Sequence, residues 1–211
     1  MGEPVKNPSR KTDLAIVGLL AAVAAVQYFA SMAGYAFPGE SARLMAVWSG
    51  LDAAPFEAHP LMAFFFRFLG GNLLAPVSGV VAVVCLYALV SRFIRDRVGG
   101  ECDERFAAPA GRVAGLVAAA VFMLAPAVRE SASHLEPRLF SVAWLLASAT
   151  LLFPLASAPR KIGWLIPGLI GVALGLGGVD SPVYLLVLPL FLLAVQRDLH
   201  ERWRVRGDEA V

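Results

Sequence analysis

Long apolar runs alternate with short polar segments along most of the chain. A helix needs roughly 20 apolar residues to cross the hydrocarbon core of a membrane, and the runs approach or reach that length. The pattern therefore predicts an all-α, polytopic helical membrane protein with about six transmembrane helices. The predicted spans are Leu14–Ala36, Leu73–Val90, Val113–Val128, Leu139–Ala156, Ile162–Val179 and Pro182–Val195.

The polar-bearing interruption between the first two spans contains two short helical patterns. Apolar residues at helical spacing predict an amphipathic helix from Glu40 along the membrane surface, with Trp48 at headgroup depth. These residues are Leu44, Val47, Trp48 and Leu51. After Pro60, an apolar stretch of about ten residues is too short to cross, so it predicts a re-entrant or interfacial helix.

Composition supports a membrane protein, and the positions of the charges predict its orientation. Hydrophobic residues make up 58% of the chain and charged residues 16%, so the chain is far more apolar than an ordinary soluble domain. With the N-terminus in the cytoplasm, fourteen of the 18 Lys and Arg fall in predicted inner segments, as the positive-inside rule requires. The four on the predicted outer side are Arg43, Arg67, Arg129 and Arg138.

These spans predict a single membrane domain in which residues 14–196 form the bundle. Residues 1–13 and 197–211 are expected to be cytoplasmic tails. The segment from Arg95 to Arg105 combines mixed charges with paired glycines, which indicates a flexible, solvated cytoplasmic linker. A net charge of +2 is too small to suggest a nucleic-acid partner.

Motifs of the common soluble enzyme classes are missing from the sequence. It has no phosphate-binding glycine loop, no nucleophile elbow and no His-Glu-x-x-His pattern. Cys85 lies in an apolar run and Cys102 in the charged linker, so a disulfide between them is not expected, and neither has metal-ligand spacing. We expect no metal site and no cofactor.

The first outer loop carries the most interesting ionisable side chains, because charged groups near a membrane are costly and often functional. Glu40 is placed to act as a general base toward an acceptor hydroxyl. Alternatively it begins a helix and pairs with Arg43 three residues later. His59 is expected to be extended because Pro60 follows it, and it either faces a ligand or forms part of a turn.

The second outer loop, residues 126–138, is the other charged patch. Arg129 and Arg138 are suited to holding a phosphate or pyrophosphate through charge-assisted hydrogen bonds. The other interpretation pairs them with Glu130 and Glu136 as ordinary juxtamembrane charges. The residues leave both interpretations open.

Several short motifs resemble a bacterial family related to protein O-mannosyltransferases, within the GT-C class of membrane glycosyltransferases. The first outer loop has Phe37-Pro38-Gly39-Glu40-Ser41-Ala42 and then His59-Pro60-Leu61, where the family has Pro-Gly-Asp-Ser-Gly-Glu and then His-Pro-Pro-Gly-Tyr-Pro. The second has Ala125-Pro126 and then Leu135-Glu136-Pro137, where the family has Ser-Pro and then Glu-Val-Tyr. The run Gly171–Gly178 is similar to a glycine-bearing span of the family.

The resemblance implies a GT-C-like N-terminal architecture in the bacterial inner membrane, with sugar transfer on the outer face. The donor would be a polyprenyl-phosphate sugar and the acceptor a hydroxyl, with inversion at the anomeric carbon. Glu40 occupies the position of the acid that binds or deprotonates the acceptor. By position, Arg43 and His59 contribute to substrate binding, and Arg129, Glu136 and Arg138 contact the donor.

The chain departs from the family pattern in three ways. Glu40 replaces the usual aspartate, which lengthens the base by one methylene group. Arg43 and Leu44 stand where Gly-Glu is expected. Members of the family carry more than six spans, so a fragment, a split subunit or a degenerate copy is expected. The alternative function is a non-catalytic GT-C-like membrane subunit or scaffold that binds another polytopic protein.

Overall fold

The computed structural model describes residues 8–32, 40–51, 59–101 and 104–156, together with residues 172 and 177. These residues contain seven α-helices and no strand, which confirms the all-α prediction. The helices are α1 (Pro8–Ala30), α2 (Glu40–Trp48), α3 (Pro60–Leu69), α4 (Gly71–Glu101), α5 (Glu104–Leu124), α6 (Pro126–Ser133) and α7 (Pro137–Ala156). Apart from residues 172 and 177, the two last predicted spans lie outside the described residues, as does the tail from 197 to 211.

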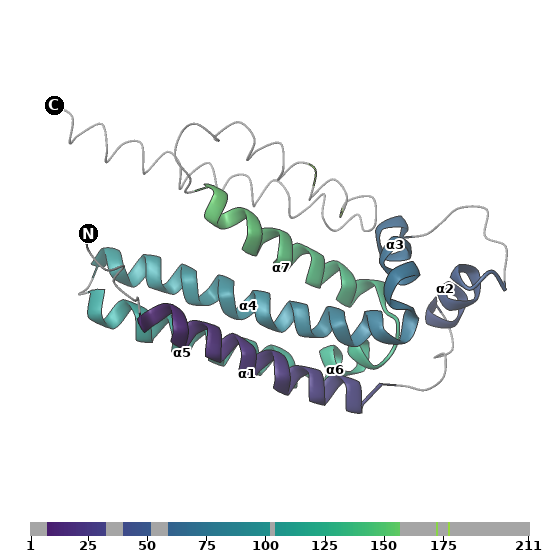
Figure 1. Ribbon diagram of the computed structural model, residues 1–211, viewed down its shortest axis with the longest axis horizontal. Helices are drawn as coiled ribbons and strands as arrows, with labels where there is room; N and C mark the ends of the chain where they lie inside the picture. Colours follow the sequence, from purple (N-terminus) through teal and green to yellow (C-terminus); the bar gives the residue numbers. More distant parts are fainter. Residues whose placement is uncertain are drawn as a thin grey trace, which may run out of the picture.

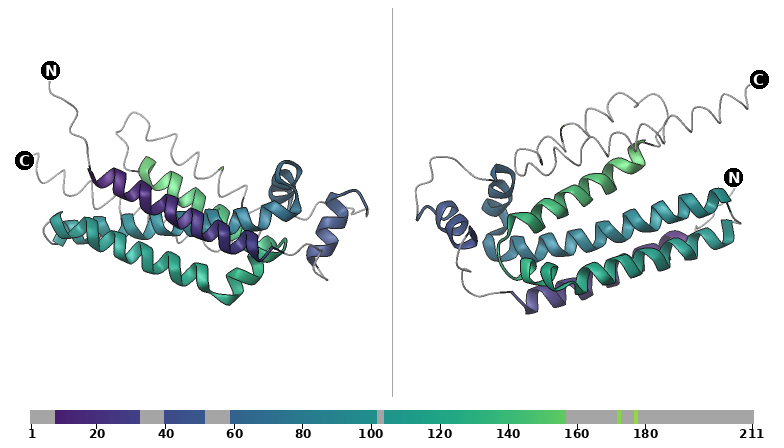
Figure 2. Two further views of the ribbon diagram at one scale, coloured as in Figure 1. Left: turned by 60° about the horizontal axis from the view of Figure 1, so that its bottom comes forward. Right: turned by 180° about the vertical axis from the view of Figure 1, so that it is seen from behind.

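Helix α4 is the centre of the bundle and packs against α1, α5 and α7 (Figure 1). Helices α1 and α5 run in one direction along the bundle, and α4 and α7 run in the other (Figures 1 and 2). The segments between α1 and α4 and between α5 and α7 consequently meet at one end, which we call the loop end. The start of α1 and the connection from α4 to α5 lie at the opposite end, which we call the junction end.

Within the described residues, three helices are long and apolar enough to cross a membrane. Their apolar stretches are Lys11–Ala30, Asn72–Gly99 and Phe106–Leu124, whereas the apolar stretch of α7, Pro137–Leu151, is shorter. Large apolar side chains point outward from these helices, for example Leu14 at 73% exposure. Exposed apolar surface of this extent is unusual for a soluble monomer, so the chain has the character of a helical membrane protein.

Glycines on α5 let this helix pack closely against α4. A Cβ atom added at Gly111 would meet the backbone carbonyl oxygen of Ser91 and would lie 3.3 Å from the Cβ of Arg95. A Cβ atom at Gly115 would lie 2.9 Å from the carbonyl oxygen of Tyr87. Membrane helices are held together largely by such close packing, which small residues permit.

Two helix boundaries at the junction end differ from the sequence prediction. Helix α1 begins at Pro8 rather than at Leu14, so part of the predicted tail is helical. The predicted flexible linker is wrong for its described residues, because α4 continues to Glu101 and α5 begins at Glu104. A glycine in a helix costs about 1 kcal/mol relative to alanine, and α4 nevertheless remains helical through Gly99.

The first predicted span also ends early, since α1 stops at Ala30 instead of Ala36. Near this end, Gln27 Nε2 donates a hydrogen bond of 3.1 Å to the carbonyl oxygen of Met123. The hydroxyl of Tyr28 donates to the same oxygen at 3.4 Å. Carbonyl groups in the last turn of a helix lack an intrahelical hydrogen-bond partner. The side chains of Gln27 and Tyr28 on α1 supply hydrogen bonds to such a carbonyl, that of Met123 at the end of α5.

Replacing Gln27 with leucine should weaken this attachment without unfolding the protein. Side-chain hydrogen bonds between membrane helices contribute about 0.6 kcal/mol on average, so we expect a small fall in the thermal unfolding midpoint in detergent. Combining Gln27→Leu with Tyr28→Phe removes both donors to Met123 and should cause a larger fall than either change alone. An unchanged midpoint in the double variant would contradict the proposed role of this carbonyl.

Candidate functional site

The loop end carries all six residues that the sequence predicts for the site. It is formed by α2, α3, α6 and the first residues of α7 (Figure 1). Two loops that are far apart in the sequence are therefore brought to the same end of the bundle. The predicted residues are Glu40, Arg43, His59, Arg129, Glu136 and Arg138.

Helix α2 begins at Glu40, as the sequence predicts, and ends at Trp48. Gly50 follows with a φ of 75°, and the N–H of Leu51 donates to the carbonyl of Ala46 at 2.8 Å. This is the hydrogen-bond pattern of a helix terminated by a left-handed glycine. Leu51, which we predicted on the apolar face of the helix, lies beyond its end and is 84% exposed.

The structure describes the two charged residues of α2, Glu40 and Arg43, to different extents. The backbone of Glu40 is the first residue of the helix, but its side chain lies outside the described part of the chain. Arg43 is exposed, whereas the next residue, Leu44, is buried against the bundle. Helix α2 thus turns the Leu44 side inward and holds the Arg43 side outward.

The extended backbone predicted for His59 is wrong. This residue has φ 61° and ψ 62°, in the left-handed region, and it precedes the first residue of α3. Histidine adopts this region more readily than most residues other than glycine. Its carbonyl accepts the N–H of Ala63 at 2.9 Å, and Pro60 occupies the first helical position, where a missing N–H does no harm. His59 therefore turns the chain into α3, and its side chain is half-buried.

A buried apolar cluster joins the two loops of the loop end. It contains Leu44 from α2, Met62 from α3, Leu74 from α4, Leu135 from the α6–α7 connection and Phe140 from α7. Burying a side chain of this size contributes about 1.5 to 3 kcal/mol. This cluster positions the start of α2 relative to the segment that carries Glu136.

A break at Ala125 ends α5 and starts α6, so the predicted span to Val128 is wrong at its end. Ala125 has φ −59° and ψ 126°, the extended conformation favoured before a proline. Its carbonyl then accepts the N–H groups of Val128 and Arg129 at 3.0 and 3.1 Å in the first turn of α6. The proline therefore redirects the chain and places residues 126–133 across the loop end.

A cavity of about 440 Å³ lies between the end of α5, α6 and the start of α7. The cavity is open to one side, and its lining combines polar residues, among them two carboxylates and a guanidinium, with apolar ones. The polar lining is Glu130, Ser131, His134, Glu136 and Arg138, and the apolar lining is Phe122, Ala127, Val128, Leu139 and Val142.

The charged wall of the cavity includes a loose ion pair. The Nε of Arg138 lies 3.9 Å from Oε1 of Glu136, and the side chains are 92% and 24% exposed, respectively. An exposed pair of this kind contributes little to stability. The donors of Arg138 are therefore accessible to an anionic ligand, and the carboxylate of Glu136 can accept hydrogen bonds from hydroxyl groups.

The predicted site residues are only partly brought together around this cavity. Glu136 and Arg138 line it, whereas Arg43, His59 and Arg129 are not among its lining residues. Arg129 is exposed on α6.

Two further residues of the cavity wall were missed as ligand contacts. The sequence predicts Glu130 only as an ion-pair partner and predicts no role for His134, although both line the cavity. His134 follows the end of α6 with an extended backbone, so helical spacing gave no signal for this pair. Ser133 lies between them in sequence, and its hydroxyl is 3.4 Å from Nδ1 of His134.

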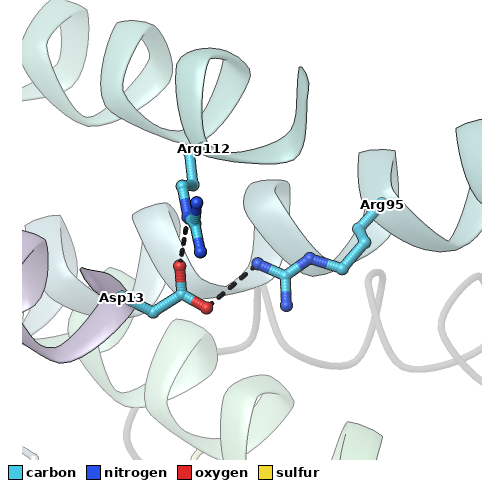
Figure 3. A network of polar contacts seen from close by, with 3 residues as sticks. All are labelled: Asp13, Arg95 and Arg112. Atoms are coloured by element: carbon cyan, nitrogen blue, oxygen red, sulfur yellow. Dashed lines mark hydrogen bonds and ion pairs between the residues drawn. The ribbon is translucent and has the colours of Figure 1, made fainter. Parts of the chain in front are cut away.

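A second ionic cluster, at the junction end, was missed entirely by the sequence analysis. Asp13 of α1 accepts a hydrogen bond of 2.6 Å from Nε of Arg112 on α5 and one of 3.1 Å from Nη2 of Arg95 on α4 (Figure 3). These residues link three helices. We had placed Asp13 in a tail and Arg95 in a solvated linker. The only sequence signal was an acid at the very start of an apolar run.

Among the described residues, no group of three or more His, Cys, Asp or Glu could hold a metal ion. Cys85 is a free, half-buried thiol on α4, and Cys102 lies outside the described residues. The ionisable groups around the cavity are carboxylates, an imidazole and a guanidinium.

Comparison with protein-family models, with curated proteins and with solved structures finds no match for this chain. Its function is therefore inferred from its own residues.

Proposed function

We propose that this membrane protein transfers a sugar from a polyprenyl-phosphate donor to an acceptor hydroxyl on the outer face of the membrane. Glu40 takes the proton of the acceptor hydroxyl as its oxygen bonds to the anomeric carbon. The bond from that carbon to the phosphate oxygen breaks, polyprenyl phosphate leaves, and the configuration inverts. In this proposal Arg43 and His59 contribute to substrate binding, and Arg129, Glu136 and Arg138 contact the donor.

The cavity at the loop end is the observation that carries the proposal. Ligand pockets commonly have volumes of about 300 to 1,000 Å³, and this one is about 440 Å³. A polyprenyl-phosphate sugar is an amphiphile, so it needs a polar wall beside an apolar one. Arg138 suits the phosphate, Glu130 and Glu136 suit sugar hydroxyls, and Phe122 and Val142 suit the isoprenoid chain.

The charge distribution supports placing the loop end outside. The described helices alternate in direction, so the start of α1 and the α4–α5 connection share one side of the membrane. Residues 8–13, 91–101 and 104–112, at the junction end, contain seven Lys and Arg, whereas the described residues of the loop end contain four. By the positive-inside rule the junction end is cytoplasmic. The proposal includes six spans, the last two being Ile162–Val179 and Pro182–Val195, with both termini in the cytoplasm of a bacterium.

Photoaffinity labelling tests the donor site directly. The full chain in detergent is exposed to a polyprenyl phosphate that carries a photoreactive group on its isoprenoid chain. We expect labelled peptides to include Phe122 or Val142, and unlabelled polyprenyl phosphate to compete better than unphosphorylated polyprenol. Arg138→Gln should weaken binding about tenfold, because a charge-assisted hydrogen bond to the phosphate is lost.

Arg97→Gln is the matched control, since Arg97 is an exposed arginine at the junction end. It should label like the unmodified protein. Equal competition by polyprenol and polyprenyl phosphate, or equal binding by the Arg138→Gln and Arg97→Gln variants, would show that the cavity does not recognise the phosphate. Sugar transfer is then measured with a panel of polyprenyl-phosphate sugars.

The second candidate is a non-catalytic membrane subunit that binds another polytopic protein. The observation that favours it is an apolar stripe on α5, in which Val113, Val117, Val121 and Leu124 are 58 to 67% exposed. Such a stripe suits a partner helix as well as lipid. Two results together would favour this candidate over the enzyme. A partner protein co-purifies with the chain and is lost when Val117 and Val121 are changed to serine, and the cavity is not labelled by the photoreactive polyprenyl phosphate.

A further inference from the structure

In the ionic cluster at the junction end, two arginines share one carboxylate, although a single ion pair would be enough to join two helices. One carboxylate, that of Asp13, is shared between the guanidinium groups of Arg95 and Arg112 (Figure 3). The side chains of Asp13, Arg95 and Arg112 are 26, 36 and 20% exposed. The cluster is thus enclosed by three helices on one side and open on the other.

Arg95 has hydrogen-bonding capacity beyond its bond to Asp13. A guanidinium group carries five N–H donors, and the Nε of Arg95 is buried without a hydrogen-bond partner among the described residues. Leaving a charged donor unsatisfied away from water is unfavourable. The Arg95 side chain as a whole is 36% exposed, so an anionic oxygen can accept hydrogen bonds from its accessible N–H groups.

The cluster lies close to the level of the lipid headgroups. Asp13, Arg95 and Arg112 are two, four and six residues inside the ends of their apolar stretches. At 1.5 Å per residue this corresponds to a depth of about 3 to 9 Å below those ends. Arginine side chains bridge such a distance, because they extend along apolar surface and hold the charged group toward the interface.

The open side of the cluster is bordered by apolar surface. Leu14, next to Asp13, is 73% exposed, and Val113, next to Arg112, is 60% exposed. A ligand that carries both a negative charge and a hydrocarbon chain can contact the guanidinium groups and these apolar side chains together.

We infer that the junction end binds an anionic phospholipid, with its phosphate against Arg95 and Arg112 and its acyl chain along the surface that contains Leu14 and Val113. This site is separate from the proposed sugar-transfer site, and it lies at the opposite end of the bundle. Basic sites between transmembrane helices on the cytoplasmic side are suited to anionic headgroups. Free phosphate lacks the acyl chain and should bind far more weakly.

The inference is tested by measuring lipid retention on the full chain. The purified protein is exchanged into nanodiscs that contain equal amounts of phosphatidylglycerol and phosphatidylcholine, and retained lipids are counted by native mass spectrometry. We expect phosphatidylglycerol to be retained preferentially. Arg95→Gln should lower the preference about fivefold, as expected for one arginine near the membrane surface. Arg97→Gln, which removes an exposed arginine of the same helix outside the cluster, controls for general attraction to the membrane surface and should lower the preference clearly less than Arg95→Gln.

Asp13→Asn should change the retention of phosphatidylglycerol in the opposite direction to Arg95→Gln. This change removes the carboxylate that competes with the lipid phosphate, so phosphatidylglycerol retention should rise and thermal stability should depend more strongly on this lipid. A merely structural clamp would lose stability equally in both lipids. The inference is overturned if the unmodified protein shows no preference, if Arg95→Gln and Arg97→Gln behave alike, or if inorganic phosphate replaces the lipid in raising the unfolding midpoint.

Discussion

Replacing Gly111 with leucine is expected to force α5 away from α4 and to destabilise the folded protein by roughly 3 kcal/mol. The first added carbon already meets the backbone carbonyl oxygen of Ser91. A backbone atom inside a helix cannot rotate aside as a side chain can, so the helices themselves must move. Arg95 lies beside the same position, at 3.3 Å from the added Cβ, and would be displaced with α4.

The effect of Gly111→Leu is measured by the thermal unfolding midpoint in detergent, with helical content followed by circular dichroism. Gly18→Leu is the control, because a Cβ at Gly18 meets nothing within 4 Å and this glycine is exposed on α1. It makes the same chemical change in another apolar helix and should leave the midpoint unchanged or slightly raised, because leucine favours a helix more than glycine does. If both variants unfold at the same temperature, close packing of α5 on α4 does not hold the bundle together.

Local patterns in the sequence were sufficient to predict two of the short helices of the loop end. Helix α2 begins at Glu40 and α3 covers Pro60–Leu69, as predicted, because these boundaries depend on neighbouring residues such as Pro60. The end of α2 at Trp48 and the helix α6 were not predicted. Long apolar runs likewise indicated the positions of α1, α4 and α5, since span length depends only on the membrane thickness.

Features that depend on distant residues were not predicted. Asp13 is separated by 82 residues from Arg95 and by 99 from Arg112, so neither partner is visible in a local window. Local propensity also disfavours a helix at Gly99, yet α4 continues through this residue. In the candidate site, the charge pattern of residues 126–138 drew attention to Arg129 and Arg138, of which Arg138 lines the cavity, and the predicted donor contact Glu136 lines it as well. The cavity itself depends on how Ala125 redirects α6 against α7.

Replacing Glu40 with glutamine is expected to abolish sugar transfer if the proposed function is correct. Removing a general base typically lowers the rate by a factor of about 10² to 10⁴. Glutamine has nearly the size of glutamate and keeps hydrogen-bonding capacity, so the first turn of α2 and the packing of Leu44 should be preserved. Glu40→Asp keeps a carboxylate and should retain activity, although a shift of about 1 Å can lower the rate roughly a hundredfold.

Comparing these two variants with a third separates catalysis from folding. Asp96→Asn changes a carboxylate to its amide at the junction end, where Asp96 makes only an exposed pair with Arg92 at 3.9 Å, and it should transfer sugar like the unmodified protein. The expected order of activity is therefore Asp96→Asn, then Glu40→Asp, then Glu40→Gln, at equal unfolding midpoints. Full activity in Glu40→Gln would exclude Glu40 as the base. Because donor labelling at the cavity depends on Arg138 rather than on Glu40, intact labelling in the inactive Glu40→Gln variant would assign the loss to the acceptor step.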